Sequence, residues 1–79
     1  MKARKTLNGA DLYRAGVSYY NDGNVVNREG KRVGFAFLCD SVTQAQKDAL
    51  RAVCPSVEFR TSSPEYAPEM KRVAIFIPR

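Results

Sequence analysis

The chain has 79 residues, the length of one small domain whose core is too modest to enclose a deep substrate cavity. Its 13 Lys and Arg residues against 8 Asp and Glu give a formal charge of +5, and 44% of its residues are hydrophobic, as in ordinary soluble domains. The sequence holds no histidine and no apolar run near ~20 residues, which argues against histidine-based catalysis, zinc sites and a membrane span.

The N-terminal part predicts a basic arm followed by a short helix. Residues 1–6 are expected to form a flexible arm, and because no apolar stretch follows, a signal peptide is not expected and the predicted location is cytoplasmic. A helix is predicted over residues 9–15, since Asn8 can cap it, Asp11 follows three residues later, and Gly16 is a typical stop.

The next segment predicts a three-stranded meander. Residues 17–20 have strand composition, Asp22-Gly23 suits a two-residue hairpin turn, and residues 25–26 continue into a second strand. A second turn at Glu29-Gly30 precedes the strongly apolar strand 31–39.

The second half predicts a longer helix and two strands. The helix spans residues 41–53, with Ser41 to Gln44 as a capping box and an apolar stripe on the side that faces the sheet, made up of Val42, Ala45, Ala49 and Val53. Strands 57–60 and 71–77 follow, separated by a proline-containing loop. If strand 57–60 runs parallel to strand 31–39, the crossover through the helix is expected to be right-handed. Because Cys39 and Cys54 bracket the helix, they are too far apart to bridge and are predicted to be buried, reduced thiols.

These elements predict a single α+β domain over residues 1–79. A mostly antiparallel sheet of four to five strands is covered on one face by helix 41–53, with helix 9–15 beside it. The segments that begin Lys31-Arg32-Val33 and Lys71-Arg72-Val73 each open an apolar run, so we expect them to be the central strands.

The run Gly34-Phe35-Ala36-Phe37-Leu38 is similar to the third-strand signature of the RNA-recognition-motif family. The resemblance implies that Phe35 and Phe37 stack on nucleic-acid bases across an open sheet. The residues themselves leave a second interpretation open. Val33, Phe35, Phe37 and Cys39 share one face of the strand by alternation, and that face would then belong to the core.

Positive charge supplies the main candidate site. If strands 31–39 and 71–77 lie side by side in parallel, four of their cations share one rim and form an edge for an anionic partner; otherwise these residues keep the strands soluble. Tyr19, Tyr20 and Tyr66 are candidates for a protein interface or for edge packing. The cationic candidates are Lys2, Arg4, Lys5, Arg28, Lys31, Arg32, Lys71 and Arg72.

No catalytic pair, metal-ligand cluster or phosphate-binding loop is recognisable in the sequence, so neither enzymatic activity nor a cofactor or metal is expected. We expect a small basic module that docks on a protein or ribonucleoprotein complex with an acidic face and modulates or inhibits it, similar in type to phage-encoded anti-defence proteins such as anti-CRISPR inhibitors. The alternative is binding of RNA or single-stranded DNA. An edge strand such as 17–20 or 71–77 also offers a place for a second copy to pair.

Overall fold

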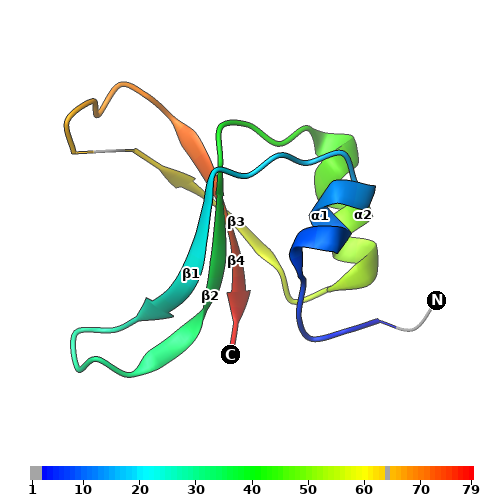
Figure 1. The fold of residues 1–79 in the computed structure, drawn as a ribbon, viewed down its shortest axis with the longest axis horizontal. Coiled ribbons are helices and arrows are strands. Elements are labelled where there is room, and N and C mark those ends of the chain that lie inside the picture. The colour runs from blue at the N-terminus through cyan, green and yellow to red at the C-terminus, as the bar shows by residue number, and fades with distance from the viewer. Residues whose placement is uncertain (1–2, 64) are drawn as a thin grey trace.

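The computed structural model describes residues 3–63 and 65–79, which form two helices and one four-stranded sheet (Figure 1). Both helices lie on the same side of the sheet (Figure 1), which confirms the predicted α+β class. The elements in chain order are α1 (Gly9–Arg14), β1 (Asn21–Val26), β2 (Arg32–Cys39), α2 (Gln44–Val53), β3 (Glu58–Ser62) and β4 (Arg72–Pro78).

The sheet has the strand order β1-β2-β4-β3, and every pair of neighbours is antiparallel. The two strands that open with Lys-Arg-Val are therefore the central ones, as the sequence predicts. Because β2 and β3 both run antiparallel to β4, they are parallel to each other, but β4 lies between them. Residues 71–77, named as one place for a second copy to pair, thus lie in a central strand, and the exposed edges of the sheet are β1 and β3.

The predicted three-stranded meander is wrong, because residues 17–20 form a connection and the segment between them and Cys39 forms a single hairpin, β1–β2. Val17 is buried and its N–H donates to the carbonyl of Leu12 at 2.9 Å, which keeps the chain beside α1 before it reaches the sheet. Asp22 and Gly23 lie inside β1, where they pair with Phe37 and Ala36 of β2. Their turn-forming composition is overridden by this pairing along β2.

The hairpin between β1 and β2 turns at residues 27–30. The side-chain oxygen of Asn27 accepts hydrogen bonds from the backbone N–H groups of Glu29, at 2.9 Å, and of Lys31, at 3.0 Å. Gly30 has φ +79°, a left-handed conformation that glycine adopts without strain. Of the two predicted turns, the fold therefore uses the one at Glu29-Gly30.

Both helices begin with a reciprocal capping box. In α1 the box joins Asn8 and Asp11, as predicted. In α2 it joins Thr43 and Gln46, so this helix begins at Gln44 instead of residue 41. The backbone N–H of Gln46 donates to the Thr43 hydroxyl at 3.2 Å, and the backbone N–H of Thr43 donates to the Gln46 side chain at 2.8 Å.

The buried side of α2 also differs from the predicted alanine stripe. Leu50 is the buried residue of this helix, whereas Ala45 and Ala49 are exposed. On the side toward β3, the cations of Lys47 and Arg51 lie over the Phe59 ring, at 5.8 and 4.9 Å from its centroid. The rotation of α2 about its axis follows from the sizes of its apolar side chains, because burying leucine removes more apolar surface from water than burying alanine.

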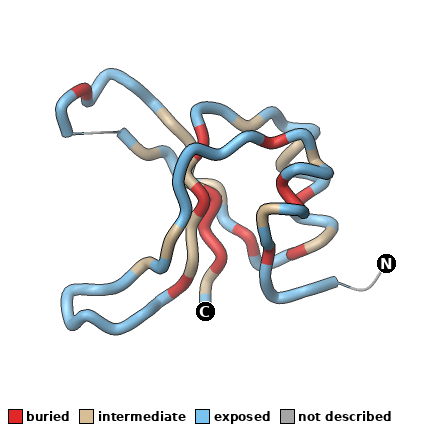
Figure 2. Tube along the Cα trace, in the orientation of Figure 1, coloured by how far each residue is buried: buried red, intermediate tan, exposed pale blue. Residues whose placement is uncertain are grey.

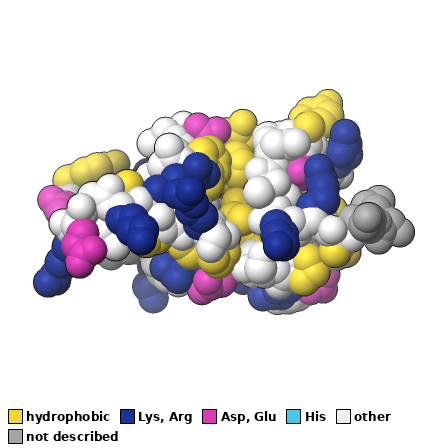
Figure 3. Space-filling view, turned by 90° about the horizontal axis from the view of Figure 1, so that it is seen from below, with side chains coloured by type: hydrophobic (Ala, Val, Ile, Leu, Met, Phe, Trp, Pro, Cys, Tyr) yellow, Lys and Arg dark blue, Asp and Glu magenta, His cyan; other side chains and the backbone are white. Residues whose placement is uncertain are grey.

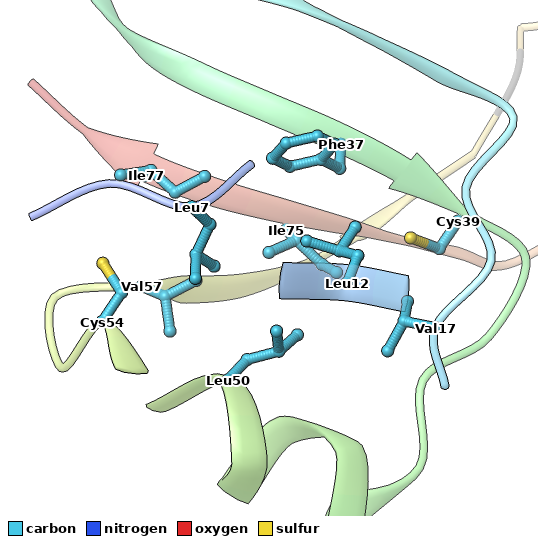
Figure 4. Packing of buried hydrophobic residues seen from close by; sticks show 10 residues of the cluster. All are labelled: Leu7, Leu12, Val17, Phe37, Cys39, Leu50, Cys54, Val57, Ile75 and Ile77. Carbon is cyan, nitrogen blue, oxygen red and sulfur yellow. The ribbon is translucent and has the colours of Figure 1, made fainter. Parts of the chain in front are cut away.

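The core lies between the sheet and the helices (Figures 2 and 4). Phe37 and Ile75, both almost fully buried, are direct partners across the β2–β4 pair. Cys39 and Cys54 are free and buried, as predicted. The cluster comprises Leu7, Leu12, Val17, Phe37, Cys39, Leu50, Cys54, Val57, Ile75 and Ile77.

Candidate partner-binding end

The rim that the sequence predicts for Lys31, Arg32, Lys71 and Arg72 does not form. In the β2–β4 pair, Gly34 lies opposite Pro78 and Cys39 lies opposite Val73. The start of β2 is therefore beside the end of β4, and the two Lys-Arg pairs lie at opposite ends of the sheet. The assumption of a parallel pair was wrong, and with it the shared rim.

Other cations lie along the side of the molecule where β2 begins, β4 ends and the N-terminal arm meets α2. The N–H of Arg79 donates to the carbonyl of Val33 at 3.0 Å, which brings the last residue beside the hairpin. The N–H of Arg4 donates to the carbonyl of Val53 at 2.7 Å, which fixes the N-terminal arm at the end of α2 that leads into β3. Figure 1 shows the hairpin, the C-terminus and the arm along the bottom of the molecule. We call this surface the basic end; it comprises Arg4, Lys5, Arg28, Lys31, Arg32 and Arg79.

Most cations of the basic end have no carboxylate partner. Within residues 3–63 and 65–79, the exposed side chains of Arg28, Lys31, Arg32 and Arg79 form no salt bridge. Arginines elsewhere are paired, with N–O distances of 3.7 Å for Arg51–Asp48, 3.1 Å for Arg60–Glu58 and 3.6 Å for Arg72–Asp40. Lys5 of the arm also forms no salt bridge, and among the described residues the other cations without one are Lys47 and Lys71, which lie elsewhere. With Glu29 as the carboxylate of the hairpin turn, this end keeps an excess of positive charge, which attracts an anionic partner.

The basic end also exposes apolar surface. Figure 3 looks onto it and shows Lys and Arg side chains on both sides of a band of hydrophobic side chains. At the hairpin, Val26 is 56% exposed and Val33 is 37% exposed, and Phe35 is half-buried. A partner that lies across this end would therefore meet both cations and apolar groups.

Arg4 is anchored by a buried carboxylate on α1. The side chain of Asp11 is almost fully buried and accepts hydrogen bonds from the backbone N–H of Asn8, at 2.9 Å, and from the guanidinium groups of Arg4 and Arg14. Burial alone raises the pKa of Asp11, but the hydrogen bond from Asn8 and the guanidinium of Arg4 outweigh it and lower the pKa below its ordinary value. Asp11 therefore stays ionised.

The aromatic residues proposed to stack on bases lie on the helix side of the sheet. Phe37 is 2% exposed and packs edge-on against Tyr19, at 5.0 Å between ring centroids, and against Phe35, at 5.1 Å. Its ring faces are thus occupied by the core, and only Phe35 retains exposed area. The second interpretation, in which this face of the strand belongs to the core, is therefore correct for Phe37.

The opposite face of the sheet carries an aromatic residue that the sequence interpretation missed. Phe76 alternates with the core residues Ile75 and Ile77, and this alternation was the signal that it must point away from the helices. The guanidinium of Arg60 lies 4.3 Å from its ring centroid and covers it. Phe76 is consequently only 7% exposed, although both described helices lie on the other side of the sheet.

The remaining candidates lie away from the basic end. Tyr20 and Arg72 meet at the other end of the sheet, with the guanidinium 5.0 Å from the ring centroid, and Lys71 is exposed there. Tyr66, 80% exposed, is in the loop between β3 and β4. On α1 the sequence interpretation missed Tyr13, which is 85% exposed. Lys2 lies outside the described residues.

Among the residues that the structure describes, no three Cys, Asp or Glu side chains gather as metal ligands do. No helix in the described ranges combines the length and the apolar character needed to cross a bilayer. Comparisons with models of protein families, with curated proteins and with solved structures found no match to the chain.

Proposed function

We propose that the protein is a non-enzymatic binding module that docks through its basic end on an acidic face of a protein or ribonucleoprotein complex, and so modulates or inhibits that complex. The observation that carries the proposal is the group of four exposed, unpaired cations at one end of a sheet whose other arginines are paired with carboxylates. Such a concentration of charge steers association with an acidic surface and orients the encounter.

A partner with a protein surface is favoured over a bare nucleic acid. The hydrophobic band between the cations suits an acidic protein face, because protein interfaces combine an apolar centre with charged groups around it. Stacking on Phe37 is not available, since the ring is enclosed by Tyr19 and Phe35. Small phage-encoded inhibitors of host complexes are similar in type, and the free buried cysteines suit the reducing cytoplasm in which we place this activity.

The proposal is tested by affinity capture from the cells that produce the protein, followed by mass spectrometry. The test variant, Lys31→Gln with Arg32→Gln, removes two unpaired cations of the basic end. The control variant, Arg51→Gln with Arg60→Gln, removes the same charge from paired positions on α2 and β3. We expect the test variant to recover roughly tenfold less of a specific complex, and the control to recover as much as the wild type.

Nuclease treatment of the lysate separates the two classes of partner. Capture that survives RNase and DNase supports a protein face. Capture that disappears, together with steeply salt-dependent binding of purified RNA or single-stranded DNA, would replace the proposal with the nucleic-acid alternative. Equal capture by the test and control variants would show that the basic end is not the docking surface.

A further inference from the structure

A hollow of about 180 Å³ lies where the N-terminal arm meets the two helices. Arg4 of the arm and Arg14 at the end of α1 line it together with Asp11, and its apolar lining is Ala15, Ala49 and Val53. Arg4 also belongs to the basic end, so the hollow continues the proposed docking surface onto the helical layer. The space exists because alanine occupies positions 15 and 49, where longer side chains would fill it.

The hollow carries a net positive charge. Two guanidinium groups share the single carboxylate of Asp11, and they do so unequally, since Arg14 Nη1 is 3.4 Å from Asp11 Oδ1 while Arg4 is closer. The side chains of Arg4 and Arg14 are 45% and 74% exposed. Each guanidinium has five N–H donors, and Asp11 occupies only part of this set, so donors remain for a second anion. One further carboxylate would balance the two guanidinium charges of the hollow with two negative charges.

The chemistry of the lining selects the kind of anion. Ala49 and Val53 offer apolar contact to a short aliphatic stem, while Arg4 and Arg14 offer paired N–H groups to a planar carboxylate. A glutamate side chain has both parts. A phosphodiester has the charge, but it brings polar ribose oxygens against the alanines and leaves their surface without an apolar partner.

We propose that this hollow receives a glutamate side chain from an acidic segment of the partner protein, with its methylene groups against Ala49 and Val53 and its carboxylate between Arg4 and Arg14. The inference rests on the proposed function, because it specifies how the same partner is held. Asp11 has a positioning role, since its carboxylate fixes both guanidinium groups at the mouth of the hollow.

The test uses two-dimensional ¹H–¹⁵N NMR of the whole chain titrated with a capped octaglutamate peptide and, separately, with a ten-nucleotide uridine RNA. The variant Ala49→Leu fills the hollow and leaves every charge in place, while Arg14→Ala removes one guanidinium. Arg51→Ala is the control, because it lies on the same helix toward Phe59 and away from the hollow. Urea unfolding of each variant shows whether the fold is retained.

We expect octaglutamate to shift the amides of residues 15, 49 and 53 as well as those of the hairpin. Ala49→Leu, by filling the hollow, and Arg14→Ala, by removing one charge-assisted contact, should each weaken binding roughly tenfold, whereas Arg51→Ala should leave it within about twofold. Shifts confined to the hairpin, or unchanged affinity of a folded Ala49→Leu variant, would overturn this inference and leave the proposed function standing. Absence of any shift at millimolar peptide would count against both, and preferential shifts of residues 15, 49 and 53 by the RNA would reverse the choice of ligand.

Discussion

The carboxylate of Asp11 joins the N-terminal arm to α1. It accepts from the backbone N–H of Asn8, the N-cap of the helix, and it binds Arg4 of the arm and Arg14 at the end of the helix. Replacing Asp11 by Ala removes one of the two hydrogen bonds of the capping box, that from the backbone N–H of Asn8, and leaves two cations without their partner. We expect Asp11→Ala to lower the free energy of unfolding by roughly 2–3 kcal/mol in urea titrations. Asp48→Ala, which breaks the exposed pair with Arg51, should cost less than about 1 kcal/mol, and equal losses would contradict this role for Asp11.

The same carboxylate contributes to the acid side of the stability profile. Its pKa is lowered in the folded state, so its contribution is fully present above the ordinary pKa of an aspartate and is lost as the pH falls through the folded value. The stability difference between wild type and Asp11→Ala should therefore shrink as the pH is lowered below about 4.

Cys39 affects the stability of the fold at alkaline pH. Burial raises the pKa of its thiol to about 11, with a smaller effect from the neighbouring charge of Asp40. A raised folded pKa means that the stability contribution is intact below the unfolded value, near 8.5, and falls as the pH rises toward the folded value. We expect wild type to lose more stability than Cys39→Ala between pH 8 and pH 10.5 in urea titrations. Parallel losses in the two proteins would show that other groups cause the decline.

Among the elements, the β2–β4 pair depends on one glycine. A Cβ atom at Gly34 would lie 2.5 Å from the carbonyl oxygen of Ile77 and 2.8 Å from the Phe76 ring, so Gly34→Ala must push the two strands apart or displace the ring. We expect a loss of roughly 2 kcal/mol or more in thermal or urea unfolding.

Gly23 of β1 is the matched control. A Cβ there meets nothing within 4 Å, and its φ is not positive, so Gly23→Ala should be neutral or stabilise by about 0.5 kcal/mol. Similar losses at Gly23 and Gly34 would mean that close strand approach is not what position 34 requires.

The sequence predicted an element best where its start and end are determined by residues close to each other in the chain. The Asn8–Asp11 box and the stop at Gly16 define α1 because both act within one turn of backbone. For α2 two overlapping boxes compete, and only the one at Thr43 has both reciprocal hydrogen bonds. The Asp22-Gly23 turn failed for another reason: whether such a pair turns or continues depends on what lies opposite it, and here that is Phe37 and Ala36 of β2.

At the scale of the molecule, charge is unevenly distributed between the two ends of the sheet, and this can be measured without a partner. The test variant, Lys31→Gln with Arg32→Gln, and the control variant, Arg51→Gln with Arg60→Gln, have the same net charge. We expect the test variant to elute from a cation-exchange column at lower salt, because it removes unpaired cations from one cluster. Co-elution of the two variants would show that net charge alone governs adsorption.

Much of the candidate site was named from the sequence, but its arrangement was not. Arg28, Lys31 and Arg32 follow from the hairpin, and Arg4 and Lys5 from the basic arm. No local sequence pattern tells whether β2 and β4 run parallel or antiparallel, because both strands begin with the same Lys-Arg-Val. Their antiparallel direction separates Arg72 from Arg32 and brings Arg79 beside Val33. The hollow could not be predicted from the sequence for a similar reason. It depends on which side of α2 faces the core, and that side is the one that carries Leu50.

Each half of the chain supplies a helix followed by an antiparallel pair of strands, and within the sheet the halves meet at β2 and β4. The two hairpins close over short or moderate loops, whereas Phe37 and Ile75, partners at the centre, are 38 residues apart in the chain. Closing the longer loop costs more entropy, which is recovered only when the apolar residues of both halves come together. We therefore expect the meeting of the two halves to limit the folding rate, so that destabilising changes at the β2–β4 seam slow folding while those in the outer strands mainly speed unfolding.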